Sequence, residues 1–338
     1  MEHIKSRGAG TRGIHQAYDT NPELLKKYLD NVLSAIDQLP CVQETDNSFR
    51  YQRLPLFASK IAKDPHGFDL NTEQGRFLIS ALQFLRSHQE KNYKPSSVPS
   101  AEEITDLLAY FGIIRDDLLN FTTCISILGC EEGKTEPAPV WESACRDGVV
   151  LNVPLREVVK MAAYKPAGSS KKVFVLENSG VFSAILDCFT GLTAPPLICT
   201  HGQLKLAALI MLDKLVENGA TIYYSGDFDP EGLQMAQRLV DRYADKLVLW
   251  HYTADDYKRC LSDVVISETR LKKLDAITAE ELKPIKEEIK RQKKAGYQEY
   301  LIEKLVKECQ VPNLLYAGVG YKITMGMGQV RSVRHLTY

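Results

Sequence analysis

Two aspartates one residue apart, Asp227 and Asp229, give the sequence its clearest chemical signal. They follow a β-branched and aromatic run at residues 222–224, which is typical of a buried strand. Pro230 and Glu231 come next and suit the first turn of a helix. Two carboxylates at the carboxyl end of a strand can bind a hard divalent cation such as Mg²⁺, which prefers oxygen ligands. A solvated turn followed by a helix cap explains the same residues, so the motif alone leaves both interpretations open.

The surrounding elements favour the cation site. Apolar runs at residues 172–178, 196–200 and 246–250 alternate with helical patterns around the run at 222–224. This alternation predicts a parallel sheet with right-handed crossovers. Open α/β sheets bind their ligands beyond the carboxyl ends of the strands. We therefore expect Glu177, near the end of the first run, to lie beside the two aspartates and to share a cation with them.

These residues also carry a resemblance to a known domain. A glutamate after one strand (Glu177), a glycine after the next (Gly202) and an Asp-x-Asp after the third resemble the Toprim domain of type II topoisomerases, bacterial primases and several nucleases. The string Gly-Asp-Phe-Asp-Pro-Glu-Gly at residues 226–232 is especially similar to the version in the A subunit of topoisomerase VI and in the meiotic break-forming proteins.

The chain resembles still more closely the Toprim nuclease subunit of Wadjet plasmid-defence systems, the JetD-like proteins. One branch of that family carries segments similar to Leu-Pro-Leu-Phe-Ala at residues 54–58 and Asp-Pro-His-Gly-Phe-Asp at residues 64–69. The similarity is strong over residues 170–260, moderate over 50–90, and touches the segment around Glu299, which stands in the place of a recurrent acid. Glu299 would add a carboxylate to the metal site or simply pair with a lysine.

The resemblance implies a metal-dependent DNA endonuclease in which Glu177, Asp227 and Asp229 bind Mg²⁺ or Mn²⁺. Glu231 would be a further metal ligand or a nearby acid, and a first-turn acid stabilised by the helix dipole also explains it. Phosphodiester hydrolysis needs an activated water and stabilisation of charge on the attacking and leaving oxygens, which divalent cations supply when bound. The resemblance further implies that the protein cuts DNA as the cleavage subunit of an SMC-like complex with kleisin-type partners, and it allows a homodimer.

The length of the chain and its stretches of turn-forming residues predict how it is divided into domains. Its 338 residues are enough for two domains with cores of their own. Stretches rich in Pro, Ser and Gly at residues 94–100 and 165–172 interrupt the periodic patterns. We predict an α/β fold in which a Toprim domain with a Rossmann-like parallel sheet follows a mainly helical domain. The predicted parts are a helical N-terminal segment (1–50), a helical or winged-helix-like domain (51–165), the Toprim domain (170–262), C-terminal helices (263–310) and an unassigned tail (311–338).

The domain before the Toprim unit fits two descriptions. A capping-box pattern at residues 100–103 opens one helix, and Asp116 or Asp117 would open a second after a glycine turn. Apolar runs at residues 124–128 and 149–153 follow. Such helices and strands can form a winged helix, a module that the relatives named above carry before their Toprim domain. A plain helical subdomain fits the pattern equally well.

The formal net charge of −1 limits how this chain can bind DNA by itself. Phosphate contacts dominate affinity for nucleic acids, so a DNA site here would be a local basic patch or would be completed by a partner. A charged helix predicted over residues 283–295 brings Lys286, Lys290 and either Lys293 or Lys294 to one face. A solvated face is the default interpretation, and a contact with the DNA backbone is the alternative.

Other features concern the cellular compartment. Eight cysteines are scattered along the chain without a Cys-x-x-Cys motif or a zinc-site spacing. No apolar run approaches the ~20 residues that a membrane span needs, and the amino terminus lacks the apolar core of a signal peptide. These features predict a reduced, cytoplasmic protein that does not contact membranes.

Two other functions would use the same acids. A transesterase similar to the topoisomerase VI A subunit would attack DNA with a tyrosine that stays bound to it. The candidates are Tyr93, Tyr110 and Tyr164, and none of them has an adjacent arginine in the sequence. The second alternative is a non-catalytic Toprim DNA-binding module in which the acids hold a structural cation.

Overall fold

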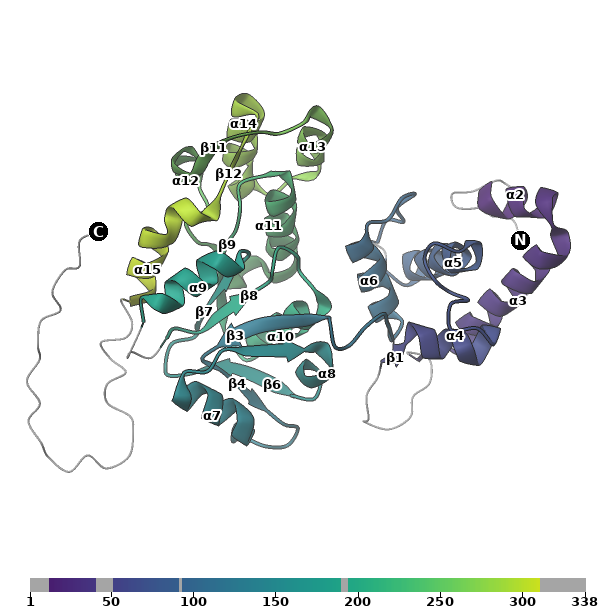
Figure 1. Ribbon diagram of the computed structural model, residues 1–338, viewed down its shortest axis with the longest axis horizontal. Coiled ribbons are helices and arrows are strands. Elements are labelled where there is room, and N and C mark those ends of the chain that lie inside the picture. The colour runs from purple at the N-terminus through teal and green to yellow at the C-terminus, as the bar shows by residue number, and fades with distance from the viewer. Residues whose placement is uncertain (1–11, 41–50, 91–92, 190–193, 311–338) are drawn as a thin grey trace, which may run out of the picture.

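The molecule has two parts, a helical part that comes first in the chain and an α/β part that follows it (Figure 1). The change from one to the other lies near residue 115, and each part has its own apolar core. The computed structural model describes residues 12–40, 51–90, 93–189 and 194–310.

The helices of the helical part are α2 (Arg12–Thr20), α3 (Pro22–Asp37), α4 (Leu54–Ala62), α5 (Glu73–Gln89) and α6 (Ala101–Tyr110). Side-chain caps that the sequence contains start α3, α5 and α6, whereas α4 begins without one. The side chain of Asn21 accepts a hydrogen bond from the Leu24 backbone at the start of α3. Ser100 and Glu103 form both hydrogen bonds of the predicted capping box at the start of α6. Apolar residues such as Phe57 pack inwards between these helices.

Four parallel strands form the centre of the α/β part, as the alternating pattern predicts. They are β7 (Lys172–Leu176), β8 (Leu197–Cys199), β9 (Thr221–Ser225) and β10 (Leu247–Leu249). Their order in the sheet is β10-β9-β7-β8. Leu176 of β7 pairs with Ser225 of β9, so the residues that follow these two strands meet at one edge of the sheet. The α/β fold with a mostly parallel, Rossmann-like sheet is confirmed.

The connecting helices define where a ligand site is expected. They are α9 (Ser179–Asp187), α10 (Leu206–Glu217) and α11 (Pro230–Tyr243). The chain goes from β7 to β8 in one direction and then back across the sheet to β9 and β10. With right-handed crossovers, this reversal places α9 on one face of the sheet and α10 and α11 on the other (Figure 1). The reversal point lies between β7 and β9, where the two strand ends open a crevice.

Residues 121–166 differ from the prediction. β3 (Phe121–Ile125) and β5 (Leu151–Pro154) pair with each other antiparallel, as the strands of a wing would, but β3 also pairs with β8 and so extends the large sheet. A second pair, β4 (Ile127–Cys130) and β6 (Ala163–Pro166), accompanies them. The segment therefore belongs to the α/β part and forms no wing on the helical part. The apolar runs indicate strands correctly, but they do not indicate which distant strand each one pairs with.

The connection between the two parts is not helical, contrary to the prediction for Asp116 or Asp117. The Asp116 carboxylate accepts hydrogen bonds from the backbone of Leu118 and of the residue after it, which makes a turn. Asp117 is 3% exposed and binds the guanidinium groups of Arg53 and Arg156. Arg53 directly precedes α4, so this ion-pair group ties the helical part to the start of the α/β part.

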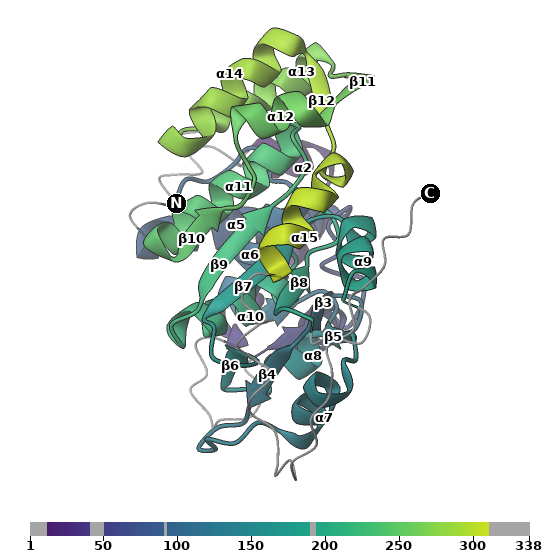
Figure 2. The ribbon, with the colours of Figure 1, turned by 90° about the vertical axis from the view of Figure 1, so that its left-hand side faces the viewer.

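A C-terminal appendage of short helices and a two-stranded sheet follows the large sheet. Its elements are α12 (Ala254–Cys260), β11 (Leu261–Val265), α13 (Glu268–Leu271), α14 (Lys283–Gln292), β12 (Lys294–Gly296) and α15 (Ile302–Gln310). The chain returns to the large sheet through α15, which packs beside α9 in both views (Figure 1 and Figure 2). The predicted tail, residues 311–338, lies outside the described residues, as do residues 1–11 and 41–50 of the predicted N-terminal segment.

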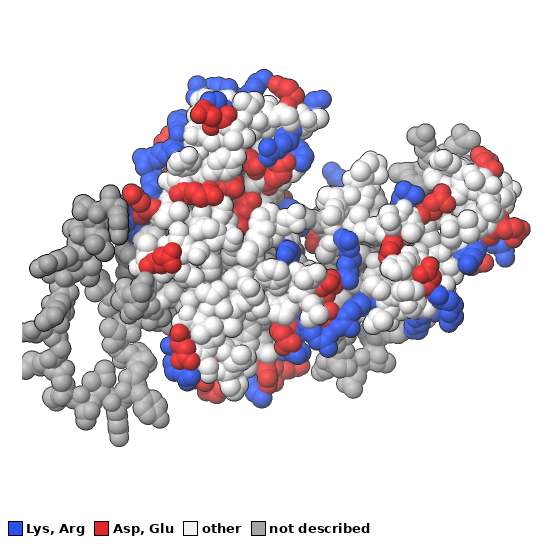
Figure 3. Space-filling model, viewed as in Figure 1, with Lys and Arg blue, Asp and Glu red and all other residues white. Residues whose placement is uncertain are grey.

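The predicted charged helix is present as α14, but the lysines expected on one face of it contact the protein itself. The contacts are Lys286 with the Ile277 carbonyl, Lys290 with Asp275, Lys293 with Glu268 and Lys294 with Asp263. Lys and Arg are mixed with Asp and Glu over the face of the molecule in Figure 3. This pattern favours the solvated interpretation of α14 over a dedicated DNA surface. In the described part of the chain, no helix has the length and apolar character to cross a membrane.

Candidate functional site

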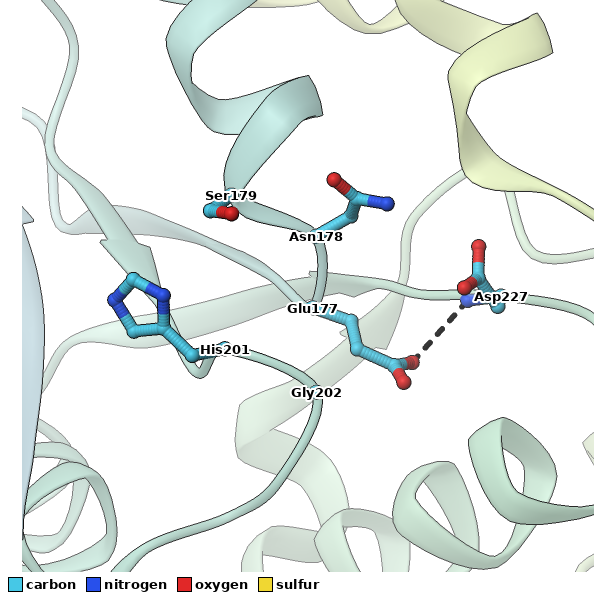
Figure 4. Close-up of a pocket in the computed structure, with 6 residues that line it drawn as sticks. All are labelled: Glu177, Asn178, Ser179, His201, Gly202 and Asp227. Carbon is cyan, nitrogen blue, oxygen red and sulfur yellow. Dashed lines mark hydrogen bonds between the residues drawn. The ribbon is translucent and has the colours of Figure 1, made fainter.

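The predicted acids Glu177 and Asp227 meet at the carboxyl edge of the sheet. Glu177 directly follows β7, and Asp227 follows β9 after a single glycine. Both line a cavity of about 240 Å³ (Figure 4). The other residues that line it are Asn178, Ser179, His201 and Gly202. The structure thus brings two of the predicted site residues together at the point where the crossover direction reverses.

Gly226 allows the two acids to approach each other. A Cβ atom on this residue would lie 2.6 Å from Glu177 Oε2 and 2.5 Å from the Tyr224 hydroxyl, closer than non-bonded atoms tolerate. Because glycine has no Cβ atom, there is room for Glu177 Oε2 to accept hydrogen bonds from the Asp227 backbone N–H at 3.2 Å and from the Tyr224 hydroxyl at 3.4 Å. The Glu177 carboxylate is therefore fixed against the turn that carries Asp227.

In the part of the chain that the structure describes, no Lys or Arg lines the cavity with these two carboxylates. Glu177 is 8% exposed, and burial together with the charge of Asp227 raises the pKa of Glu177 to about 8. Burial also raises the pKa of Asp227 to about 6, against a hydrogen bond from the Gln298 backbone and with a further increase from Glu299. With these pKa values Glu177 holds a proton at neutral pH, whereas Asp227 is largely ionised there, because burial disfavours the charged form of Glu177 more strongly. A cation in the cavity would be bound in exchange for the Glu177 proton.

Asp229 and Glu231 lie in a different environment, because Arg270 of α13 neutralises both of them. Arg270 Nη2 is 2.5 Å from Asp229 Oδ2 and 2.6 Å from Glu231 Oε2. The other Asp229 oxygen accepts a hydrogen bond from the Gly232 backbone and caps α11. Although burial acts to raise the pKa of Glu231, hydrogen bonds from Arg270 and Lys273 lower it to about 2. The four predicted acids therefore form two pairs, and only Glu177 and Asp227 line the cavity.

Contacts from the C-terminal appendage fix the Asp227 turn from the other side. The backbone of Phe228 exchanges hydrogen bonds of 2.8 and 3.0 Å with Gly296 of β12. The Gln298 backbone N–H donates to Asp227 Oδ1 at 2.9 Å, and the Tyr252 hydroxyl donates to the Asp227 carbonyl at 2.7 Å. The appendage thus orients the carboxylate of Asp227 as well as its backbone.

Glu177 and Asp227 fit a divalent cation in the kind and number of their ligand atoms. Mg²⁺ keeps several waters and commonly takes only one or two carboxylates from a protein. Their uncompensated negative charge is of the sign that such an ion neutralises. Within the ranges that the structure describes, no group of three or more His, Cys, Asp and Glu side chains is arranged to hold a metal ion. The fit consequently rests on this pair of carboxylates.

Two family models match the chain. One, described as Protein of unknown function C-terminus (DUF2399), matches residues 151–309, and the other, described as Protein of unknown function N-terminus (DUF3323), matches residues 4–129. The chain carries both domains. None of the curated proteins matches it. The DUF2399 domain begins at β5 and contains all the acids described above, whereas the DUF3323 domain extends as far as β4 and contributes β3 to the same sheet.

Three residues that the sequence did not single out, Asn178, His201 and Arg270, lie at or beside the candidate site in the DUF2399 domain. Asn178 Nδ2 donates to Glu299 Oε1 at 2.8 Å, so Glu299 lies near the cavity and pairs with an amide rather than with a lysine. His201 lines the cavity beside Gly202, the glycine that the sequence singles out. Asn178 follows Glu177 and His201 precedes Gly202 in the sequence, so their position beside predicted residues could have indicated that they lie at the site. Arg270 gave no such signal, because it lies 41 residues from Asp229 in the chain.

The tyrosines considered for transesterification lie outside the cavity lining. Tyr164 is fully buried, and its hydroxyl donates to the Val158 carbonyl. Folding brings the Arg86 guanidinium over the rings of Tyr93 and Tyr110, at 4.6 and 4.5 Å from their centroids. These two tyrosines have no arginine beside them in the sequence, but they share one in space.

Proposed function

We propose that the protein is a DNA endonuclease of the Toprim type that depends on Mg²⁺ or Mn²⁺. The observation that carries the proposal is the pair formed by the buried Glu177 and the half-buried Asp227, at the ends of adjacent parallel strands, with no Lys or Arg in the cavity lining that the structure describes. The resemblance of residues 226–232 to the Toprim Asp-x-Asp string supports it. Pairs of acids at such a position suit metal-assisted hydrolysis of phosphate esters.

The residues of the chain would divide the work as follows. Glu177 and Asp227 hold the cation, and when bound it provides a nucleophile near neutral pH and stabilises charge on the reacting oxygens. The Tyr224 hydroxyl and the Asp227 backbone keep the Glu177 carboxylate in place. Asp229 and Arg270 hold the start of α11 against α13, so that the Asp227 turn keeps its shape. Neither Asp229 nor Glu231 is needed as a ligand in this arrangement.

We further propose that the protein works as the cleavage subunit of an SMC-like anti-plasmid complex with kleisin-type partners, in the cytoplasm. The resemblance to the Wadjet nuclease subunit supports this assembly, and it allows a homodimer. The net charge of −1 supports a need for partners, because a protein that grips DNA alone usually presents a basic surplus.

Cleavage of supercoiled plasmid by the purified protein tests the proposal. We expect nicked and linear DNA with Mg²⁺ or Mn²⁺ and intact plasmid in EDTA. Glu177→Gln and Asp227→Asn should each abolish cleavage, because each removes a charged ligand. Asp263→Asn is the matched control, since Asp263 is a fully exposed acid that pairs with Lys294 and lies outside the cavity lining. Cleavage that survives EDTA, or a Glu177→Gln variant that cuts at the wild-type rate, would refute the metal site.

One observation favours a second candidate, the tyrosine transesterase. Arg86 lies over both Tyr93 and Tyr110, and an arginine close to a tyrosine can stabilise an attacking phenolate. These tyrosines do not line the cavity with Glu177 and Asp227, so this chemistry would need them to reach the acids of another subunit. A non-catalytic DNA-binding module remains the outcome if neither type of cleavage is detected.

A further inference from the structure

His201 is held in a backbone conformation that few residues adopt. Its φ is 56° and that of Gly202 is 76°, so two successive residues after β8 are left-handed. Histidine tolerates this region better than most side chains, but it still costs free energy that the surroundings must supply. The Gly202 backbone N–H donates to the Glu177 carbonyl at 2.9 Å, which ties this turn to the strand that carries the acid. With this backbone conformation, the His201 ring lines the same cavity as Glu177.

The ring is oriented by the antiparallel extension of the sheet. His201 Nε2 lies 2.5 Å from Thr123 Oγ1 of β3, and Thr123 Oγ1 lies 2.5 Å from Asn152 Oδ1 of β5. The Phe121 ring lies against the imidazole, with 5.3 Å between the centroids. Strands β3 and β5, which the sequence suggested as a wing, thus support a side chain of the site instead.

The hydrogen bonds around His201 determine which of its two ring nitrogens carries the proton. The Thr123 hydroxyl has a single proton and donates it to Asn152 Oδ1, so His201 Nε2 must carry a proton and donate it to Thr123. A neutral imidazole has one N–H, so Nδ1 then presents a lone pair. Figure 4 shows one ring nitrogen of His201 pointing away from the cavity residues and the other on the side of Ser179. In the described part of the chain, no group donates a hydrogen bond to Nδ1.

We propose that His201 accepts, at Nδ1, a proton from the water that attacks the phosphodiester. The inference rests on the proposed nuclease function and adds a catalytic residue to it. The water oxygen forms the new bond to phosphorus while its proton passes to Nδ1. The bond from phosphorus to the leaving sugar oxygen breaks, and that oxygen takes a proton from solvent. Such a base contributes roughly 10²- to 10⁴-fold to a rate when it is well positioned.

The charges around the ring are compatible with this role. Burial, and then the positive charge of Lys205, lower the pKa of His201 below its ordinary value, so the ring is neutral at physiological pH. Lys205 lies over the Phe121 ring, with its Nζ 4.2 Å from the centroid. The carboxylates Glu177 and Asp227 line the same cavity and are the groups that a bound cation would neutralise.

The test is a kinetic comparison of His201→Asn with the wild type. Asparagine tolerates the left-handed backbone, so the turn should keep its shape. At saturating Mn²⁺, with bis(p-nitrophenyl) phosphate and with supercoiled plasmid, we expect kcat to fall by about 10²-fold or more with KM little changed. The wild-type pH–rate profile should contain a step below pH 6.5 that comes from His201, and the variant should lose this step while keeping the one that comes from the cation-binding carboxylates. Thr123→Val removes the hydrogen bond that orients the His201 ring but keeps the ring itself, so it should lower kcat by a smaller factor.

Two controls make the result specific. His251 also has a left-handed backbone, with φ 46°, but does not line the cavity, so His251→Asn should behave as the wild type. Asn152→Asp supplies a group that can only accept the Thr123 proton, so it should preserve activity if Nδ1 is the base. Loss of activity in Asn152→Asp would overturn that role, because it would mean that Nδ1 must carry the proton.

The outcomes separate this inference from the proposed function. The rise in Tm that Mn²⁺ causes should be the same in His201→Asn and in the wild type, because the carboxylates are intact. A wild-type kcat and pH profile in His201→Asn would overturn the role of His201 and leave the nuclease standing. Absence of hydrolysis of both substrates by the wild type would overturn the proposed function and this inference with it.

Discussion

At the scale of single residues, the candidate site consists of two acids whose surroundings disfavour the ionised carboxylate. Glu177 and Asp227 are held by hydrogen bonds from the backbone and from a tyrosine, but no cationic side chain faces them in the cavity lining that the structure describes. Asp229, two residues further on, is neutralised by Arg270. The pKa of Glu177 is raised to about 8 by burial and by the charge of Asp227, whereas hydrogen bonds from Arg270 and Lys273 lower the pKa of Glu231 to about 2, so the two acids lie in opposite electrostatic environments.

The raised pKa of Glu177 predicts how stability depends on pH. Its folded-state value of about 8 lies above its ordinary value of 4.5, so the folded protein retains a proton that the unfolded chain releases. Without divalent cations, stability should therefore fall as the pH rises from about 4.5 to about 8. Glu177→Gln cannot ionise and should be more stable than the wild type at pH 8, by about 2 kcal/mol, with the difference vanishing near pH 4.5. Urea unfolding in EDTA at several pH values measures this.

A cation should reverse the effect wherever Glu177 is intact. At pH 8, Mn²⁺ bound by Glu177 would take the place of its proton, so Mn²⁺ should raise the Tm of the wild type clearly more than that of Glu177→Gln. Asp263→Asn, which changes an exposed acid, should respond as the wild type does. Equal Tm shifts in the wild type and Glu177→Gln would show that the ion binds elsewhere.

At the scale of elements, the parallel strands and the pairing partners of the other strands were not equally predictable. The runs that became β7, β8, β9 and β10 are short, apolar and separated by helical patterns, so their type and order follow from local composition. β3 and β5 are equally recognisable as strands, but β3 joins β8 across more than seventy residues of chain, and no local pattern records that. The same holds for Arg270 beside Asp229 and for Arg86 between two tyrosines.

The connection between the helical and α/β parts yields a second prediction. The hydrogen bond from Arg53 lowers the pKa of Asp117 despite its burial, and Arg156 adds to the effect. A lowered pKa means that this carboxylate stabilises the fold above its ordinary value near 3.8 and that the contribution is lost as the pH falls below it. Asp117→Asn should therefore lower the free energy of unfolding by about 2 kcal/mol at pH 7.

The pH dependence distinguishes this ion pair from simple packing. The difference between Asp117→Asn and the wild type should shrink as the pH falls from 4 towards 3. Asp147→Asn serves as the control, because Asp147 pairs with Arg146 at an exposed position and should change stability little. A deficit in Asp117→Asn that stays constant down to pH 3 would contradict the ion-pair explanation.

At the scale of the whole molecule, charge is the property that most limits function. Lys and Arg total 42 and Asp and Glu total 43, and the lysines of α14 and of the residues just after it contact groups of the chain itself. Few Lys and Arg side chains are therefore available to contact the phosphates of DNA, and affinity for duplex DNA depends on such contacts. We expect the isolated protein to bind a linear duplex weakly and only at low salt. Fluorescence anisotropy across a salt series measures this, and nanomolar binding at physiological salt would indicate a nuclease that needs no partner.

The last prediction separates hydrolysis from transesterification, which would use the same acids but different nucleophiles. Hydrolysis leaves free DNA ends, whereas a tyrosine leaves protein attached to one end. A tyrosine hydroxyl, with an ordinary pKa near ~10, must lose its proton to attack. Burial raises the pKa of Tyr93 further, and the hydroxyl of Tyr110 donates to Gln89. Arg86 contacts the ring faces of both, and its charge, together with a hydrogen bond to Gln83, acts against the burial that raises the pKa of Tyr93.

We therefore expect detergent to release protein-free DNA from the cleavage reaction. Tyr93→Phe and Tyr110→Phe should cut at the wild-type rate, because each keeps the ring that Arg86 packs on and loses only the hydroxyl. Arg86→Gln should lower stability but leave the products unchanged. A protein–DNA band that is sensitive to protease and disappears in one of the two phenylalanine variants would identify the nucleophile as that tyrosine. In that case Glu177 and Asp227 would serve a transesterase, and the water-activating role of His201 would fall with the nuclease.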